Sequence, residues 1–395
     1  MKNLIILILV LSNYFQIGIS QTFEPDWVLK TKKPFFSSPS VSDGIVYAGS
    51  LDSNLYAVDI NSGNILWYFK TSGEIRSTAL VENNQVYFIS GDGYLYCLDT
   101  SGKLLWTFKT RGEKKYDFAD YHRSSPVYYK NSLFFGSGDG NIYALNSENG
   151  ELLWKYQTED VVHSTPVVDD SNLYVGSFDG YFYALNINDG SMKWKYKTTG
   201  QKYFPKGEVQ GSPAIYKNNI IFGARDYKVY ALDKDNGSLI WEKTFVNGWV
   251  LSNSIYLDEL IIAGADERII ACLDPVTGIE KWKRKMEFLI FGKPAFNENF
   301  LFIGTTIGKL HGLNLKTGEI IRTFSTEAYN QNKHKYFKKD DSYRDDIYSI
   351  IKSDEHFLEV EIELGGFFSS PVIYNEKLVV TSTDGNIYCF KIILE

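Results

Sequence analysis

Short apolar runs separated by turn residues follow one another along most of the chain. Between residues 132 and 158, "SLFFGS", "NIYALN" and "ELLWKYQT" mix apolar and polar positions, and Asp-Gly and Asn-Gly divide them. Runs of this length and alternation are typical of β-strands, and Asp-Gly or Asn-Gly supplies the positive φ that a tight hairpin requires. The pattern therefore predicts antiparallel strands joined by hairpins, and an all-β fold.

The same unit returns along the chain, and eight copies can be aligned, each predicting four strands. Repeats of about forty residues that each form a four-stranded sheet are typical of a β-propeller. The eighth copy ends after its third strand, and "PDWVLKT" at residues 25–31 matches the missing outer strand. The sequence thus predicts an eight-bladed β-propeller of four-stranded antiparallel blades, with the last blade closed by the N-terminal strand. An Asp opens the central hairpin in seven copies and is interpreted as a turn former: Asp52, Asp92, Asp139, Asp179, Asp226, Asp266 and Asp384.

A Trp recurs four residues after a Gly in six copies, from Trp67 to Trp282, and Trp27 holds the same place in the N-terminal strand. A large flat side chain on an outer strand packs well between sheets, and its indole N–H needs a partner. We therefore expect a structural role for these residues. Trp249 lies outside the register, and the sequence leaves open whether it contacts a ligand or is buried under a loop.

The unit "SSPxV…DGxxYALDxxTGxxxW" resembles the pyrroloquinoline-quinone-type (PQQ-like) propeller repeat, from about Trp27 to Ile392. The resemblance implies the propeller fold and two kinds of protein: quinoprotein dehydrogenases, and non-catalytic BamB-like scaffolds of outer-membrane-protein assembly. It also implies, for the dehydrogenases, an adjacent Cys pair and a calcium site of Glu, Asn and Asp. The three Cys here are not adjacent; Cys97, Cys272 and Cys389 fill a small apolar slot of the repeat and are interpreted as buried hydrophobes.

Charge and the chain ends narrow the function classes. The net charge of -7 over 395 residues leaves no basic stripe, which argues against nucleic-acid binding. Residues 1–20 combine Lys2, a short apolar run and small residues, which predicts a cleaved signal peptide followed by a single propeller domain at 21–395. No later apolar run is long enough to span a bilayer, and no lipid-acceptor Cys follows the cleavage point. We expect a monomeric periplasmic or secreted protein.

Three connections between blades are longer than the others: residues 111–123, 199–210 and about 327–366. The propeller topology places all three on one face, and long loops on a rigid scaffold often carry function. The polar first half of the third connection predicts a mobile loop, and the alternating "FLEVEIEL" predicts an added strand. The candidate partner-binding residues of these loops are Tyr116, Phe118, Tyr121, His122, Tyr203, Phe204, Tyr336 and Phe337.

A second candidate site is the lip of the central channel, formed by the residue before each innermost strand. In ring order these residues are Phe36, Arg76, Arg123, His163, Gln210, Leu251, Phe291 and Phe368. Blades 2 to 5 thus contribute polar or basic groups, and the others contribute apolar ones. Arg pairs well with carboxylates and Phe offers an apolar surface, so the lip fits a partner or ligand with an acidic and an apolar edge. The same residues could instead plug the channel, and the sequence does not decide between the two.

Motifs for catalysis are missing from the sequence, which has no paired His at metal spacing, Ser nucleophile motif or phosphate-binding glycine loop. This favours an exported, non-catalytic propeller that binds an envelope protein or a small ligand, without a cofactor or a metal. Whether the chain is an enzyme stays open. The alternatives are a PQQ-dependent dehydrogenase with calcium, and a secreted carbohydrate- or peptide-binding protein.

Overall fold

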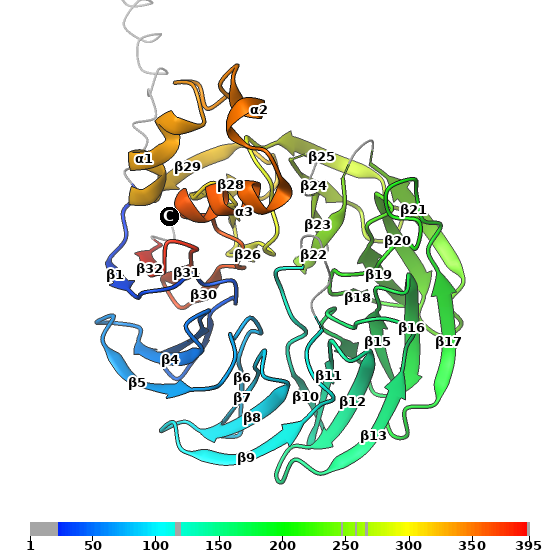
Figure 1. Cartoon of the computed structure of the whole chain (residues 1–395). Helices are drawn as coiled ribbons and strands as arrows, with labels where there is room; N and C mark the ends of the chain where they lie inside the picture. The colour runs from blue at the N-terminus through cyan, green and yellow to red at the C-terminus, as the bar shows by residue number, and fades with distance from the viewer. Residues whose placement is uncertain (1–22, 115–119, 246–247, 257–258, 265–267, 393–395) are drawn as a thin grey trace, which may run out of the picture.

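The computed structural model describes residues 23–114, 120–245, 248–256, 259–264 and 268–392. Their strands form eight four-stranded antiparallel sheets, and Figure 1 looks along the axis around which these sheets are arranged. The predicted eight-bladed propeller is therefore confirmed. The predicted signal peptide, residues 1–20, and the hairpin Asp266 lie outside the described residues.

The strands follow the repeat in chain order, innermost strand first. Blade 1 comprises β2 (Ser40–Ser42), β3 (Ile45–Gly49), β4 (Asn54–Asp59) and β5 (Ile65–Lys70), and blade 2 comprises β6 (Leu80–Glu82), β7 (Gln85–Ile89), β8 (Tyr94–Asp99) and β9 (Leu104–Lys109). Blade 3 comprises β10 (Val127–Tyr129), β11 (Ser132–Gly136), β12 (Asn141–Asn146) and β13 (Leu152–Gln157), and blade 4 comprises β14 (Val167–Val168), β15 (Asn172–Gly176), β16 (Tyr181–Asn186) and β17 (Met192–Lys197). Blade 5 comprises β18 (Ala214–Tyr216), β19 (Asn219–Gly223), β20 (Lys228–Asp233) and β21 (Leu239–Thr244), and blade 6 comprises β22 (Val250–Tyr256), β23 (Glu259–Gly264), β24 (Ile269–Leu273) and β25 (Glu280–Lys285). Blade 7 comprises β26 (Ala295–Phe296), β27 (Phe300–Thr305), β28 (Lys309–Asn314) and β29 (Ile320–Ser325). Blade 8 comprises β30 (Val372–Tyr374), β31 (Lys377–Thr381), β32 (Asn386–Lys391) and the N-terminal strand β1 (Trp27–Lys30).

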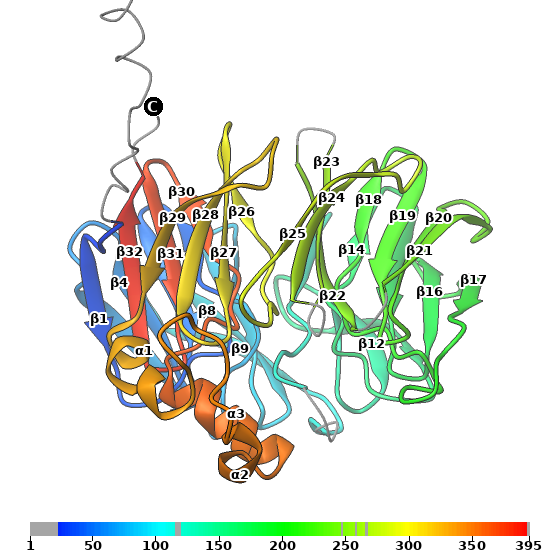
Figure 2. The same ribbon diagram turned by 90° about the horizontal axis from the view of Figure 1, so that it is seen from above.

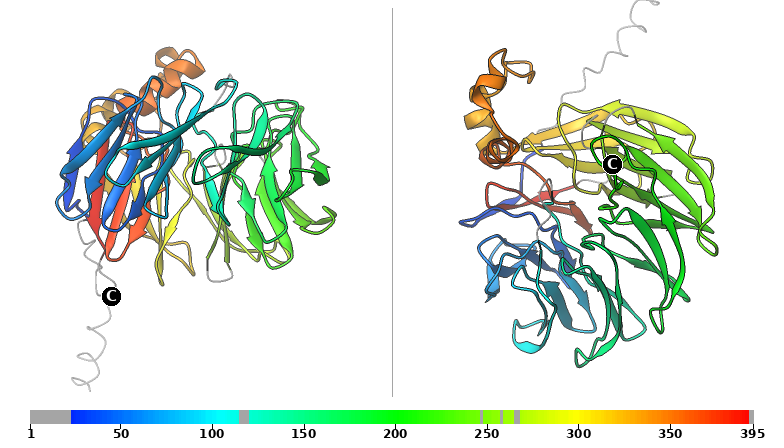
Figure 3. Two further views of the ribbon diagram at one scale, coloured as in Figure 1. Left: turned by 90° about the horizontal axis from the view of Figure 1, so that it is seen from below. Right: turned by 45° about the vertical axis from the view of Figure 1, so that its right-hand side comes forward.

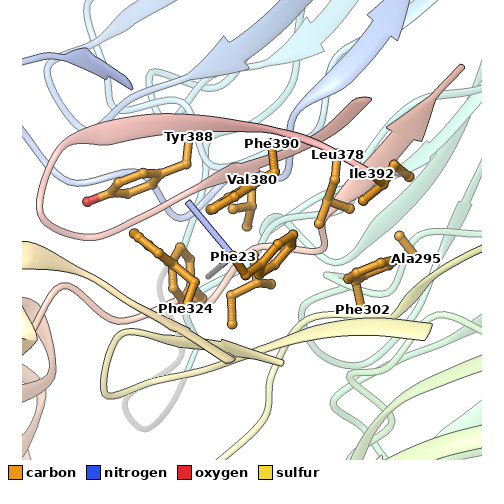
Figure 4. Packing of buried hydrophobic residues seen from close by; sticks show 11 residues of the cluster. Phe23, Ala295, Phe302, Phe324, Leu378, Val380, Tyr388, Phe390 and Ile392 are labelled. Atoms are coloured by element: carbon orange, nitrogen blue, oxygen red, sulfur yellow. The ribbon is translucent and has the colours of Figure 1, made fainter. Parts of the chain in front are cut away.

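The N-terminal strand completes the last blade, as predicted. β1 pairs antiparallel with β32, and Trp27 lies opposite Cys389 in the register that Trp154 and Ala144 have in blade 3. Phe23, just before β1, is 6% exposed and stacks on Phe390 with ring centroids 4.6 Å apart (Figure 4). The first and last parts of the described chain therefore share one core cluster between blades 7 and 8.

Each repeated Trp connects its blade to the next one. Trp154 Nε1 donates to the carbonyl of Ile187 at 2.9 Å, and the indole lies against Gly190 of the following blade. Gly190 has φ +71°, and a Cβ there would lie 2.5 Å from Trp154, so this position requires glycine for two reasons. Such Trp–Gly contacts join seven neighbouring pairs, and an apolar cluster fills each of the eight blade interfaces. The expected structural role of the Trp series is borne out.

The long connection after blade 7 differs from its prediction. It holds α1 (Glu327–Asn332), the 3-10 helix η1 (Lys333–Lys335), α2 (Ile347–Ile350) and α3 (Asp354–Glu363), which lie on one face of the ring (Figures 2 and 3). "FLEVEIEL" is helical and not a strand: Ser353 caps α3, and its hydroxyl accepts the His356 N–H at 3.2 Å. The polar first half is likewise folded, because Tyr329 and Phe337 bury their rings in a cluster with α3. Tertiary contacts here outweigh the local alternation.

Candidate functional site

In several blades the residue after the lip position anchors the innermost strand. The Ser37 hydroxyl donates to the Gly49 carbonyl at 2.7 Å, and the Ser77 and Ser369 hydroxyls make the equivalent bonds at 2.9 and 2.7 Å. Each of these hydroxyls holds the start of an innermost strand against its neighbour in the same blade. The preceding lip side chains are thereby fixed around the axis.

The apolar half of the lip forms a compact aromatic cluster. The ring centroids of Phe36 and Phe368 are 5.0 Å apart, and those of Phe291 and Phe368 are 5.3 Å apart. Tyr121, from the first long connection, packs edge-on against Phe291 and Phe368 at 5.2 and 4.9 Å. The three Phe side chains are at most 6% exposed. We call Phe36, Tyr121, Phe291 and Phe368 the aromatic plug, and it closes the channel at the face that carries the insertions.

All three long connections meet at this plug. Phe204 from the second connection and Leu358 and Ile362 of α3 belong to the same apolar cluster as the plug. Trp249 joins it and packs edge-on against Phe204 at 5.0 Å, so this Trp is buried under a loop. Figure 3 shows α3 and the first connection on the same face of the ring. The predicted placement of the insertions on one face is therefore observed.

The polar half of the lip is a buried ion-pair network. Arg123 Nη1 lies 2.9 Å from Asp120 Oδ2, and Arg123 Nε lies 3.6 Å from Glu113 Oε2. His163 contacts the same two carboxylates, with Nδ1 2.8 Å from Asp120 and Nε2 3.5 Å from Glu113. The four side chains are at most 4% exposed. Arg123 and His163 are brought together as the lip prediction requires, but their charges are already matched within the protein.

The pKa of His163 follows from this network. Burial disfavours the imidazolium, but the hydrogen bond and charge of Asp120, supported by Glu113, outweigh burial and raise the pKa of His163. The network therefore favours the protonated imidazole, which places a second positive charge beside the two carboxylates. Both carboxylates, Glu113 and Asp120, belong to the first connection. This segment lies outside the aligned repeat, so the sequence did not indicate their positions and they were not predicted as site residues.

Arg76 and Gln210 also have partners within the protein. Arg76 Nε lies 3.2 Å from Glu74 Oε1, and the guanidinium stacks over the Phe36 ring at 5.1 Å. Gln210 accepts two hydrogen bonds from Arg225, at 3.2 and 2.8 Å. Arg225 is completely buried and stacks on Trp249 at 4.8 Å. Arg225 was not predicted as a site residue. The sequence did carry a signal for it, because Arg225 takes the repeat position that Gly138 holds in blade 3.

The remaining candidate residues separate into different environments. Leu251 lies in β22, and Tyr116 and Phe118 lie outside the described residues. Tyr203 is 70% exposed, whereas Tyr336 and Phe337 are buried in the core of the insertion.

His122 supports the plug from the side. Its Nε2 lies 3.0 Å from the Phe368 carbonyl, so the Nε2–H donates and Nδ1 is left as an acceptor. Burial lowers the pKa of His122 to about 4. At neutral pH His122 therefore carries no charge.

Behind the plug the channel holds a cavity of about 380 Å³. Its walls are made mainly by residues that come just before the innermost strands, and its lip end is formed by Arg76, His122, Arg123, His163, Gln210 and Phe291. Lip and cavity therefore form one site, closed at the insertion face by the aromatic plug.

The sequence matches a known family over most of its length. The profile described as outer membrane protein assembly factor BamB matches residues 21–131, 118–248 and 211–333. The chain belongs to this family. No curated protein matches the chain in sequence.

Solved structures share the BamB-type propeller. BamB from Moraxella catarrhalis superposes with a TM-score of 0.69 at 14% identity, covering 94% of this chain and 100% of that one. The computationally designed Ika8 protein gives 0.69 at 17% identity, with coverages of 92% and 98%. Quinohemoprotein alcohol dehydrogenase from Comamonas testosteroni gives 0.70 at 16% identity, with coverages of 95% and 78%. At these identities the likeness establishes the fold and no activity.

Two further features of the described part of this BamB-family chain bear on function. No group of three or more His, Cys, Asp and Glu residues there is arranged to hold a metal ion. Over the same residues, no helix is long and apolar enough to cross a membrane. Cys97, Cys272 and Cys389 are buried free thiols, in accord with their interpretation as small hydrophobes.

Proposed function

We propose that the chain is an exported, non-catalytic scaffold of the cell envelope, which binds a protein partner through the face that carries its insertions. The observation that carries this proposal is the convergence of the three long connections, because Tyr121, Phe204 and Ile362, one from each, pack in a single cluster. Among the described residues the other connections of the propeller are short, so in that part of the chain this face departs from the repeat. Membership of the BamB family supports a binding role.

The insertion face is held rigidly enough to recognise a partner. Its apolar contacts are anchored on the plug, and the buried network of Arg123, His163, Asp120 and Glu113 fixes the first connection. A preorganised surface loses less conformational entropy on binding than a mobile one. The helical insertion adds its own core, so α2 and α3 are presented as a folded unit.

Two exposed aromatic side chains offer contact points on this face. Tyr348 on α2 is 92% exposed, and Tyr203 on the second connection is 70% exposed. Exposed Tyr side chains often become energetic centres of protein interfaces, because they bury a large area with few rotatable bonds. The buried Tyr336 and Phe337 instead hold the insertion together.

Crosslinking and affinity capture from envelope extracts test the proposal. We expect the full chain to capture a partner, and a chain lacking residues 330–361 to lose it. Because that deletion uncovers part of the plug, a second variant with Tyr203→Ser and Tyr348→Ser keeps every buried contact described above. Tyr68→Ser is the matched control, since Tyr68 is 64% exposed on the outer strand β5. Unchanged capture by both face variants would refute a role for this face.

The second candidate function is a PQQ-dependent dehydrogenase, favoured by the likeness to the quinohemoprotein alcohol dehydrogenases over 95% of the chain. A quinone-bound calcium requires six to eight oxygen ligands, usually with carboxylates among them. Among the described residues, no Asp or Glu lines the channel cavity, so the calcium part of such a site fits poorly. Addition of the quinone and calcium tests this candidate. A bound chromophore together with dye-linked alcohol oxidation would establish the dehydrogenase function. The absence of both signals would exclude it.

A further inference from the structure

A ring of hydroxyl groups lines the channel behind the plug. The second residue after each lip position is Ser38, Thr78, Ser125, Thr165, Ser212 or Ser370 in six blades, and all six line the cavity. In four places a backbone N–H donates to the hydroxyl of the next blade. These bonds run from Ser370 to Ser38 (2.8 Å), Thr78 to Ser125 (2.9 Å), Ser125 to Thr165 (2.9 Å) and Lys293 to Ser370 (2.7 Å). The ring therefore belongs to the construction of the propeller.

These bonds leave hydrogen-bond donors in the channel. Each of the four hydroxyl oxygens accepts a backbone N–H, so its own proton is left to donate elsewhere. Within the described residues, none of these hydroxyls donates to a protein acceptor. Four O–H groups at the wall of one cavity are thus available to an acceptor that enters it.

Lys293 holds the same position in blade 7 and replaces the hydroxyl by an ammonium group. Its backbone N–H keeps the ring contact to Ser370, and its side chain lines the cavity. Among the residues that the structure describes, the ammonium has no hydrogen-bond or ion-pair partner, and no carboxylate lines the cavity beside it. Burial lowers the pKa of Lys293 to about 8, which still leaves it largely cationic at neutral pH.

The other cations at the cavity are already matched. Arg123 and His163 share Asp120 and Glu113, and Arg76 pairs with Glu74, so these charges are compensated before a ligand arrives. His122 is neutral at this pH, since its pKa is about 4. The charge of Lys293 is therefore the uncompensated one among the described cavity residues. Lys293 is partly buried at the channel wall, where an ammonium without a counter-charge is less favourable than in bulk water, and a bound anion would relieve that cost.

We infer that the channel cavity is a binding site for a small organic carboxylate, held by the Lys293 ammonium and the hydroxyls of Ser38, Ser125, Thr165 and Ser370. A carboxylate accepts several hydrogen bonds at once and so matches one cation beside several O–H donors. The volume of about 380 Å³ lies at the small end of ligand pockets. This site is independent of the proposed scaffold role, because it lies behind the plug and not on the insertion face.

Calorimetric titration of the full chain at pH 7, in Tris buffer free of other carboxylates, tests the inference. The probes are acetate, succinate, citrate, inorganic phosphate, and pyrroloquinoline quinone without calcium. We expect at least one carboxylate to bind, and Lys293→Ser to weaken that binding by about 10-fold or more, as expected for loss of a charged hydrogen bond. Lys293→Arg keeps the charge and should retain most of the affinity.

The variants are chosen to keep the fold. Ser occupies the position of Lys293 in blades 1, 3, 5 and 8, so Lys293→Ser restores the ring residue. Lys283→Ser, on the exposed side of β25, removes the same charge outside the channel and serves as the control. Equal carboxylate binding by wild type and Lys293→Ser would overturn the assignment, as would binding of phosphate alone or of no probe. Quinone binding that depends on Lys293 would support the carboxylate site and would also revive the dehydrogenase candidate.

Discussion

Replacing Glu361 by Gln changes the pH dependence of stability in a defined way. Glu361 lies in α3, is 1% exposed, and has an Oε1 atom without a hydrogen-bond partner among the described residues. Burial raises the pKa of its carboxyl group from 4.5 to about 8, and this effect exceeds the opposing one of the Thr306 hydroxyl, which favours the ionised form. The folded protein therefore holds Glu361 protonated at pH 7, whereas the unfolded chain ionises it.

The expected change in the free energy of unfolding follows from proton linkage. Because the folded pKa is raised, the protonated carboxyl contributes its full stability below pH 4.5, and this contribution is lost as the pH rises through about 8. At pH 7 the gap to the ordinary pKa corresponds to about 3 kcal/mol, at 1.36 kcal/mol per pKa unit. Glu361→Gln removes this loss, so the variant should match wild type at pH 4 and exceed its stability by up to about 3 kcal/mol at pH 7.

Urea unfolding followed by Trp fluorescence at pH 4, 7 and 8.5 measures the effect. Glu359→Gln is the matched control, because Glu359 is exposed on the same helix. We expect the control to follow wild type at all three pH values. Parallel pH profiles for wild type and Glu361→Gln would show that Glu361 ionises normally in the folded protein, and would refute the reasoning.

Three further variants test the buried ion-pair network, the closure of the propeller and the Trp–Gly contacts between blades. Asp120→Asn should lower the free energy of unfolding by about 3 to 5 kcal/mol, because it leaves the charges of Arg123 and His163 without enough negative charge beside them. In denaturant melts, the difference in unfolding free energy between wild type and variant should narrow as the pH rises through the raised pKa of His163. A difference below about 1 kcal/mol would contradict the stabilising role of the network. Phe23→Ala should cost about 3 to 5 kcal/mol, since the ring is 6% exposed between Phe390 and Phe302, and equal melting temperatures would exclude a closing role for this contact. Gly190→Ala should destabilise more than Gly44→Ala: both have positive φ, +71° and +78°, but an added Cβ meets Trp154 at 2.5 Å in the first and nothing closer than 3.8 Å in the second. Equal losses of stability in the two Gly variants would show that Trp154 does not pack tightly against Gly190.

The repeat made the propeller predictable because each element is specified many times over. Asp139, for example, accepts the Asn141 N–H at 2.9 Å and the Tyr143 hydroxyl at 2.6 Å, and the same pattern recurs at Asp179. Trp27 showed where the ring closes, since it lies outside the eight copies yet fits their register. These features depend on local turn chemistry and on periodic apolar positions, which a single sequence displays directly.

The insertions were harder to predict because they occur once. The alternation in "FLEVEIEL" outweighed a helix signal that was also present, a Ser353 cap followed by acidic residues in the first turn. The helix forms because Leu358 and Ile362 reach the plug cluster while Val360 and Leu364 reach the core of the insertion. In the same way, the lip positions were placed correctly by the repeat, but their carboxylate partners were not, because residues 111–123 have no counterpart elsewhere in the chain.

The pairing of β1 with β32 has a consequence for the order of assembly. The Thr31 hydroxyl donates to the Gly385 carbonyl at 2.8 Å, across a separation of 354 residues. Blade 8 therefore cannot be completed until the C-terminal strands have been synthesised and β32 has paired with β1. Any folding intermediate that forms earlier exposes the edge of β32 or of β1, and such unpaired edges promote aggregation. A nascent chain of this protein therefore keeps an aggregation-prone edge until its two ends meet.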